Sequence, residues 1–120
     1  TKFVIPHPLD PEHMSLEHAA IEGPEAAVYY RGEAKLVDGA VTVKLPEYFE
    51  ALTREEDRTV LVTPKFESEE PIAQLAASAV KDGQFHVRAV DAQNPAQAFY
   101  WEVRAVRADQ PKLEVEVPRT

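Results

Sequence analysis

Three histidines near the start of the chain are the residues whose type and spacing first suggest metal chemistry. His7, His13 and His18 lie close together and are interleaved with carboxylates, and imidazole with carboxylate is a common ligand set for zinc. Their spacing does not match the His-Glu-x-x-His pattern that puts two imidazoles on one helix face. We therefore predict no metal site, and we expect His18 to be half-buried on a strand, satisfied by a backbone carbonyl or a carboxylate.

No other group of side chains predicts catalysis. Two carboxylates at a suitable separation could hydrolyse a glycosidic bond, and the candidates are Glu22, Glu25, Glu47 and Glu50. Nothing in the sequence sets that separation. The serines lie in no Gly-x-Ser-x-Gly turn, and the four glycines form no phosphate-binding loop; the serines considered are Ser15, Ser68 and Ser78. The sequence therefore predicts no catalytic residue, no cofactor and no enzyme activity.

Two pairs of adjacent aromatic residues are the best candidates for ligand binding. Tyr29-Tyr30 and Tyr100-Trp101 each place their two rings on opposite faces if they lie on strands, so one ring of each pair can be exposed. An exposed Tyr or Trp ring stacks well on a sugar, but an outward aromatic ring also commonly packs at a subunit interface. We predict Tyr30, Tyr100 and Trp101 as ligand-binding residues, with glycans as the ligand class.

Two Asp-Gly dipeptides indicate the turns of the fold that must position these residues. Asp38-Gly39 and Asp82-Gly83 each lie between two segments in which apolar and polar residues alternate. Asp-Gly readily adopts the positive φ angles of tight turns. We predict two β-hairpins, whose similar patterns could reflect a faint duplication.

Most of the remaining chain also has strand patterns. Further strands are predicted at 16–21, 26–31, 59–63, 98–107 and 112–117. The core-facing residues of 98–107 are predicted to be Phe99, Trp101, Val103 and Ala105, and 112–117 is expected to be a polar edge strand. One short helix is predicted at 47–56, after Pro46. The fold class is therefore all-β, an antiparallel sandwich or barrel-like domain with one short helix near residues 47–55.

The first fifteen residues differ from the rest in their high proline content. Prolines at 6, 8 and 11 predict an extended path with little backbone pairing after residue 5. We expect residues 1–15 to form a proline-rich arm and residues 16–120 a single β domain. Phe3, Val4 and Ile5 need burial, either on their own domain or against a neighbouring subunit. We predict the second arrangement, with these three residues as contacts of a homo-oligomer.

Composition narrows the range of partners. The chain has 120 residues with 13 basic and 21 acidic side chains, a formal net charge of −8, so phosphate backbones and anionic lipids are repelled unless a basic patch exists. We predict neither nucleic-acid nor membrane binding. No cysteine is present, so stability comes from packing. The chain begins with Thr1, which we interpret as a processed product or an excised piece.

Several of these residues resemble a known type of module. The segments His7-Pro-Leu-Asp-Pro11, Glu22-Gly-Pro-Glu25 and Leu45-Pro-Glu-Tyr-Phe-Glu-Ala-Leu52 resemble a β-rich module of phage tail-fibre proteins and large bacterial surface proteins, which lies near an intramolecular chaperone. The resemblance covers residues 3–64, about half of the chain. It implies a structural, trimeric role in a fibre or surface context and assigns no catalytic residue.

We therefore expect a thermostable, non-catalytic structural module of a phage virion appendage that assembles as a homotrimer, on the virion or at a cell surface. Its expected partners are other copies of itself and other virion or surface proteins. The alternatives are a carbohydrate-binding or protein-binding module of a bacterial surface protein, and a phage capsid decoration protein.

Overall fold

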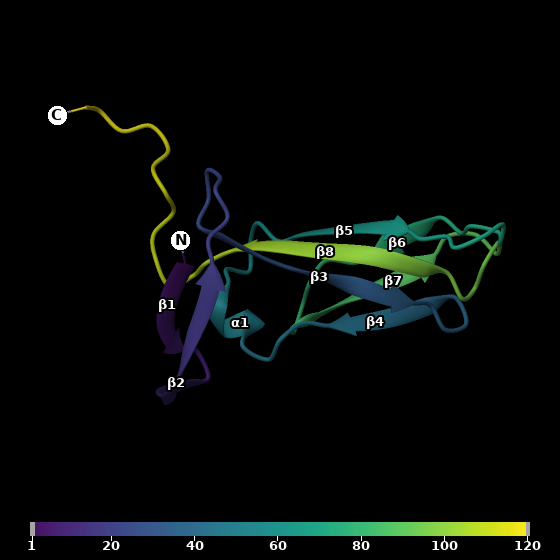
Figure 1. The fold of residues 1–120 in the computed structure, drawn as a ribbon, viewed down its shortest axis with the longest axis horizontal. Coiled ribbons are helices and arrows are strands. Elements are labelled where there is room, and N and C mark those ends of the chain that lie inside the picture. Colours follow the sequence, from purple (N-terminus) through teal and green to yellow (C-terminus); the bar gives the residue numbers. More distant parts are fainter. Residues whose placement is uncertain (1, 120) are drawn as a thin grey trace.

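The computed structural model describes residues 2–119, and nearly all of its regular structure is β-strand (Figure 1). The elements in chain order are β1 (Lys2–His7), β2 (Asp10–Ala19), β3 (Ala27–Lys35), β4 (Ala40–Lys44), α1 (Phe49–Leu52), β5 (Thr59–Pro64), β6 (Leu75–Ala77), β7 (Gln84–Ala89) and β8 (Ala98–Val106). The predicted all-β fold with one short helix is confirmed.

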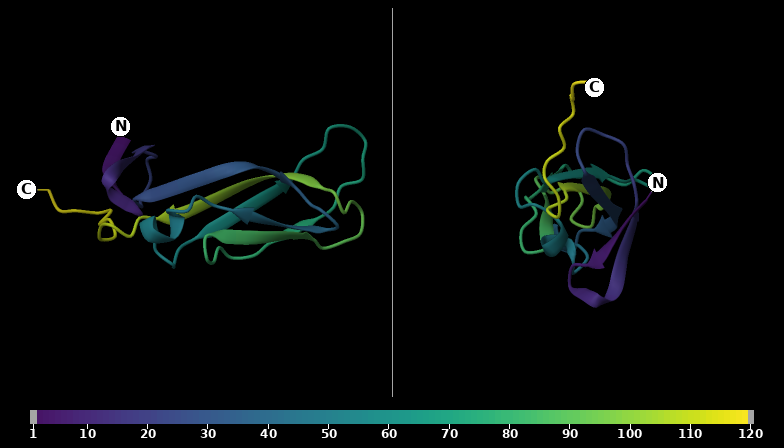
Figure 2. Two further views of the ribbon diagram at one scale, coloured as in Figure 1. Left: turned by 90° about the horizontal axis from the view of Figure 1, so that it is seen from below. Right: turned by 90° about the vertical axis from the view of Figure 1, so that its left-hand side faces the viewer.

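Two three-stranded antiparallel sheets pack face to face and form the body of the protein. The strand order is β3–β8–β5 in the first sheet and β4–β7–β6 in the second. The largest fully buried apolar side chains come from the body strands, from α1 and from the turn after β3: Phe49, Phe85, Phe99, Leu36, Leu52, Val87 and Val103. The body is an open sandwich, and with the terminal segments it measures 57 × 38 × 24 Å (Figure 2).

Both Asp-Gly dipeptides form the predicted tight turns. Asp38 and Gly39 have φ angles of 51° and 88°, and Asp82 and Gly83 have φ angles of 53° and 73°, the positive values of a two-residue turn. The second turn joins β6 to β7 as a hairpin within one sheet. The first turn does not, because β3 pairs with β8 while β4 pairs with β7. It is instead a corner that passes the chain from one sheet to the other.

Strand β8 is the centre of the first sheet and carries the predicted core face. Its side chains that face the second sheet or the core are Phe99, Trp101, Val103 and Ala105. The ring of Trp101 lies 5.5 Å from that of Phe85 on β7, centroid to centroid. Gly32 is opposite Trp101 on β3, and a Cβ atom there would lie within 3.0 Å of the indole. Glycine is required because the indole crosses the backbone at this point.

The helix is shorter than predicted. It contains one turn, Phe49–Leu52, instead of residues 47–56, and Thr53 returns to an extended conformation. Acidic residues follow at 55–57, where the helix dipole disfavours negative charge. Among residues 2–119, no helix has the length and apolar composition needed to cross a membrane.

The prediction of a weakly paired arm over residues 1–15 is wrong in the described part. Strands β1 and β2 form a hairpin that packs on one end of the sandwich (Figure 1), and the expected boundary at residue 16 falls inside β2. Pro6 pairs with Ser15 but His7 pairs with Asp10, so residues 11–14 have no partner on β1. Proline is tolerated at such a register break.

The hairpin places the three predicted oligomer contacts in different environments. Phe3 and Ile5 pack against the core of their own chain, because alternate residues of β1 point toward the body. Val4 points away and is 54% exposed. Val4 is therefore the most exposed of the three residues, and Phe3 and Ile5 are half-buried.

The strand predicted at 112–117 is not formed. Residues 111–114 and 117–119 have no regular structure, 115–116 form a bend, and the whole segment 111–119 is exposed. It runs away from the body at the end that also holds the hairpin (Figure 2). The alternation of apolar and acidic residues is present, but no strand of the described chain pairs with it.

Candidate functional site

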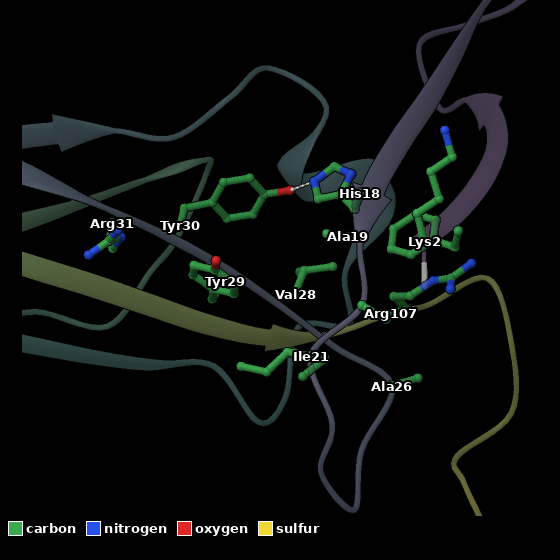
Figure 3. A pocket seen from close by; sticks show the side chains of 13 residues that line it. Lys2, His18, Ala19, Ile21, Ala26, Val28, Tyr29, Tyr30, Arg31 and Arg107 are labelled. Atoms are coloured by element: carbon green, nitrogen blue, oxygen red, sulfur yellow. Dashed lines mark hydrogen bonds between the residues drawn. The ribbon is translucent and has the colours of Figure 1, made fainter.

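A cavity of about 510 Å³, here called the junction cavity, lies at the junction between the β1–β2 hairpin and the edge strand β3 (Figure 3). The hairpin contributes Phe3 and His18, and β3 contributes residues 27–31. The lining is mostly apolar. Its charged residues are all basic, namely Lys2, Arg31 and Arg107. In a chain with a net charge of −8, the lining of this cavity is therefore a local concentration of positive charge beside apolar side chains.

His18 is the centre of the contact between hairpin and sandwich. Its Nε2 lies 3.0 Å from Tyr30 Oη and 3.4 Å from Tyr48 Oη, and its ring stacks on Phe3 with centroids 5.1 Å apart. Figure 3 shows Tyr30 reaching across to this imidazole. The expected partner, a carbonyl or a carboxylate, is wrong, because a tyrosine hydroxyl takes that place. His18 Nδ1 is buried and finds no hydrogen-bond partner within residues 2–119.

Burial favours the neutral forms of two titratable groups in this contact, His18 and Tyr30. Burial, followed by the positive charge of Arg107, holds the pKa of His18 below its usual value. Burial, followed by the hydrogen bond with Tyr48, raises the pKa of Tyr30 well above its ordinary value. In their neutral forms, the imidazole and the Tyr30 phenol can each donate and accept hydrogen bonds.

Two of the basic residues are held by neighbouring carboxylates that do not line the cavity. Lys2 Nζ lies 2.7 Å from Glu17 Oε1. Arg107 donates from Nε to Asp109 at 2.8 Å, and its guanidinium lies 3.8 Å from the Phe3 ring centroid, a cation–π distance. Arg31 forms no ion pair within residues 2–119. It is therefore the cation most available to a ligand.

The His7 ring lies 5.4 Å from the Tyr48 ring, centroid to centroid, and Tyr48 also contacts His18. The polar contacts of His7 and His13 are with other groups. His7 Nδ1 accepts a hydrogen bond from the Leu9 amide at 3.1 Å, and His13 Nδ1 lies 2.8 Å from Asp10 Oδ1. In the part of the chain that the structure describes, no three His, Asp or Glu side chains are placed to hold a metal ion.

Among the carboxylates considered for hydrolysis, Glu50 is held in place by hydrogen bonds. Glu50 is bonded by Arg58 at 2.9 and 3.0 Å and by the Gly83 amide at 2.9 Å. Burial opposes its ionisation, but these bonds outweigh burial and hold the pKa of Glu50 below its usual value. Glu50 therefore ties the Asp82-Gly83 turn to α1. The remaining candidates are exposed side chains, as are the three serines: Glu22, Glu25, Glu47, Ser15, Ser68 and Ser78.

The three predicted ligand-binding residues do not converge. Tyr30 lines the junction cavity, Trp101 points into the sandwich, and Tyr100 lies on the outer face of the first sheet, 49% exposed. Tyr100 borders a second groove of about 510 Å³ beside Leu61. The ammonium group of Lys65 lies 5.6 Å from the centroid of the Tyr100 ring.

Sequence reasoning missed two residues of the junction, Tyr48 and Arg107. Tyr48 lies within the predicted helix 47–56, and its place on the apolar face of that helix was the available signal. Arg107 follows β8, and no local pattern indicates that it lies over Phe3, more than a hundred residues earlier in the chain.

Comparisons with known proteins identify no relative: no family model, curated protein or solved structure matches the chain. Its function is therefore inferred from its own residues and geometry.

Proposed function

We propose that this chain is a non-catalytic structural module of a phage tail fibre or a related surface appendage, and that it assembles as a homotrimer on the virion or outside the cell. The resemblance of residues 3–64 to modules of such proteins supports this context. The elongated sandwich, with both described ends of the chain at one end of the body (Figure 1), is compatible with a module that contacts its neighbours there.

The exposed apolar face of residues 111–119 is the observation that carries the proposal. Leu113, Val115 and Val117 are 57%, 65% and 64% exposed, although they alternate with glutamates as in a half-buried strand. Extended apolar segments of this kind tend to pair with other chains, since water solvates them poorly. Self-assembly covers them, and it also raises resistance to unfolding because association stabilises the folded state.

Light scattering coupled to size exclusion tests the proposal. We expect a mass of about three times the 13.4 kDa of one chain at micromolar concentration, and a melting temperature that rises with protein concentration. A mass of one chain at that concentration, with a melting temperature independent of concentration, would contradict self-assembly. A stable dimer would contradict the trimer alone.

Glycan binding at Tyr100 is a second candidate function, and the observation that favours it is the half-exposed Tyr100 ring beside a groove. Polar side chains of both signs, Arg31 and Glu102, line the same groove, and such groups can bond sugar hydroxyls around a stacked ring. Trp101 also lines the groove, but its indole packs against Phe85 between the sheets, and Tyr30 is not part of this surface.

A glycan array with two tyrosine variants tests this candidate. Tyr100→Ala should abolish binding, whereas Tyr29→Ala, a change at another exposed tyrosine of the first sheet, should leave it intact. An array without signal, or one on which both variants bind as the unchanged protein does, would remove glycan binding from consideration.

A further inference from the structure

The junction cavity follows an open strand edge. β3 is hydrogen-bonded to β8 on one side only, and its consecutive residues 27–31 all line the cavity. Consecutive residues of a strand point to opposite faces of the sheet. Because residues from both faces line the cavity, the cavity opens along the edge of the sheet. An added strand could lie there with its backbone paired to β3, a recurring mode of peptide recognition.

Residues 112–117 have the chemistry that this edge would accept. Their apolar residues, Leu113, Val115 and Val117, share one face of an extended chain, and Glu114 and Glu116 share the other. The cavity offers apolar walls from Phe3, Ile21 and Val28, and its charged lining is entirely basic. Segment and cavity are therefore complementary in both polarity and charge.

The segment is held away from the cavity of its own chain. Arg54 donates to the carbonyl oxygens of Arg107 and Gln110, and Lys112 Nζ lies 3.3 Å from Asp57 Oδ2. These contacts fasten residues 107–112 to the loop between α1 and β5. The following residues leave the body from there (Figures 1 and 2).

We propose that residues 112–117 of one copy bind in the junction cavity of a second copy, as an added strand along the open edge of β3. The apolar face of the segment then packs toward Phe3 and Val28, and its glutamates lie on the side of Arg31. This inference rests on the proposed self-assembly and names its contact. Donor and acceptor surfaces differ, so the contact is head-to-tail, and three such contacts can close a ring.

A labelled peptide of residues 110–119 tests the acceptor surface. The receiving protein carries Val115→Ser, so that its cavity is not filled by other copies. We expect Arg31→Glu in this protein to weaken peptide binding at least tenfold, and Arg88→Glu, a matched change on the outer face of the second sheet, to alter it less than twofold. A peptide with Glu114→Lys and Glu116→Lys should reverse the preference and bind the Arg31→Glu protein better.

The mass of full-length variants tests the donor segment. Val115→Ser should reduce the assembly to single chains, whereas Val4→Ser, at a valine of similar exposure on the hairpin, should not. An assembly that survives Val115→Ser, together with a peptide that does not bind, overturns this inference and leaves self-assembly standing. Dissociation by Val4→Ser alone overturns it in favour of a hairpin contact.

The remaining outcomes separate the two proposals. A single-chain protein whose cavity binds the peptide with the predicted charge dependence supports the strand contact and overturns the trimer. A single-chain protein that does not bind the peptide overturns both. Peptide binding that is unchanged by Arg31→Glu overturns the assigned surface, whatever the mass.

Discussion

Replacing Tyr30 by phenylalanine tests what holds the hairpin on the sandwich. The Tyr30 hydroxyl lies 3.0 Å from His18 Nε2, and the remaining partner of that atom, Tyr48 Oη, is at 3.4 Å, a long distance for such a bond. Phenylalanine keeps the ring, so the change removes only the hydroxyl, with its hydrogen bonds to His18 and Tyr48. Leaving a buried polar group without its partner costs about 1–3 kcal/mol. Since Tyr48 stays in reach, we expect Tyr30→Phe to lower the free energy of unfolding by about 1–2 kcal/mol.

Urea unfolding followed by tryptophan fluorescence measures this loss, because Trp101 is the only tryptophan and packs between the sheets. We expect a lower midpoint with an unchanged slope. Amide exchange in β1 detects any opening of the hairpin that precedes global unfolding. Tyr29→Phe is the control, since the Tyr29 hydroxyl has no hydrogen bond within residues 2–119. Equal losses in both variants, with β1 equally protected, would refute a role for the Tyr30–His18 bond.

Three further changes probe the rest of the fold. Because the pKa of His18 is lowered in the folded chain, the unfolded chain takes up that proton first. The contribution of His18 to the free energy of unfolding is therefore fully present above pH 6.5 and is lost as the pH falls below that value. The pH dependence measured by urea unfolding should be flatter in His18→Gln. Gly32→Ala places a Cβ against Trp101 and should cost about 1–3 kcal/mol, with a shifted emission maximum. Gln97→Leu leaves buried backbone groups unpaired and should cost about 2–4 kcal/mol by urea unfolding, against no more than about 0.5 kcal/mol for the exposed Gln93→Leu.

The local sequence pattern was sufficient to predict the two turns and the buried face of β8, because these features depend only on neighbouring residues. The two Asp-Gly turns depend only on the φ angles of four residues, and the core face of β8 depends only on strand periodicity. Both predictions are confirmed. The path taken after Asp38-Gly39 was not accessible in this way, because a turn sequence fixes a reversal of the chain and leaves open which sheet each strand joins.

The features that could not be predicted from the sequence depend on contacts between segments that are far apart in the chain. Nothing near His18 indicates Tyr30 as its partner, because the pair forms only when the hairpin docks on β3. Gln97 is fully buried and bonds the Ala73 amide and the Lys65 carbonyl, yet it lies in a loop whose composition predicts exposure. At 112–117 the alternation predicts a strand, but no strand of the described residues pairs with this segment, and a strand without a partner does not form.

Ring closure determines how strong the proposed strand contact needs to be. Burying three apolar side chains contributes about 1.5–3 kcal/mol each, and ordering six residues of backbone costs about 1–2 kcal/mol each. These terms nearly cancel, so a single contact depends on its backbone hydrogen bonds and is weak. In a closed trimer the third contact forms within an assembly that two contacts already hold together, at a high effective concentration. We therefore expect the isolated peptide to dissociate at a concentration at least a hundredfold above that at which the trimer does. Comparable values from peptide titration and from dilution of the trimer would show that the ring adds nothing.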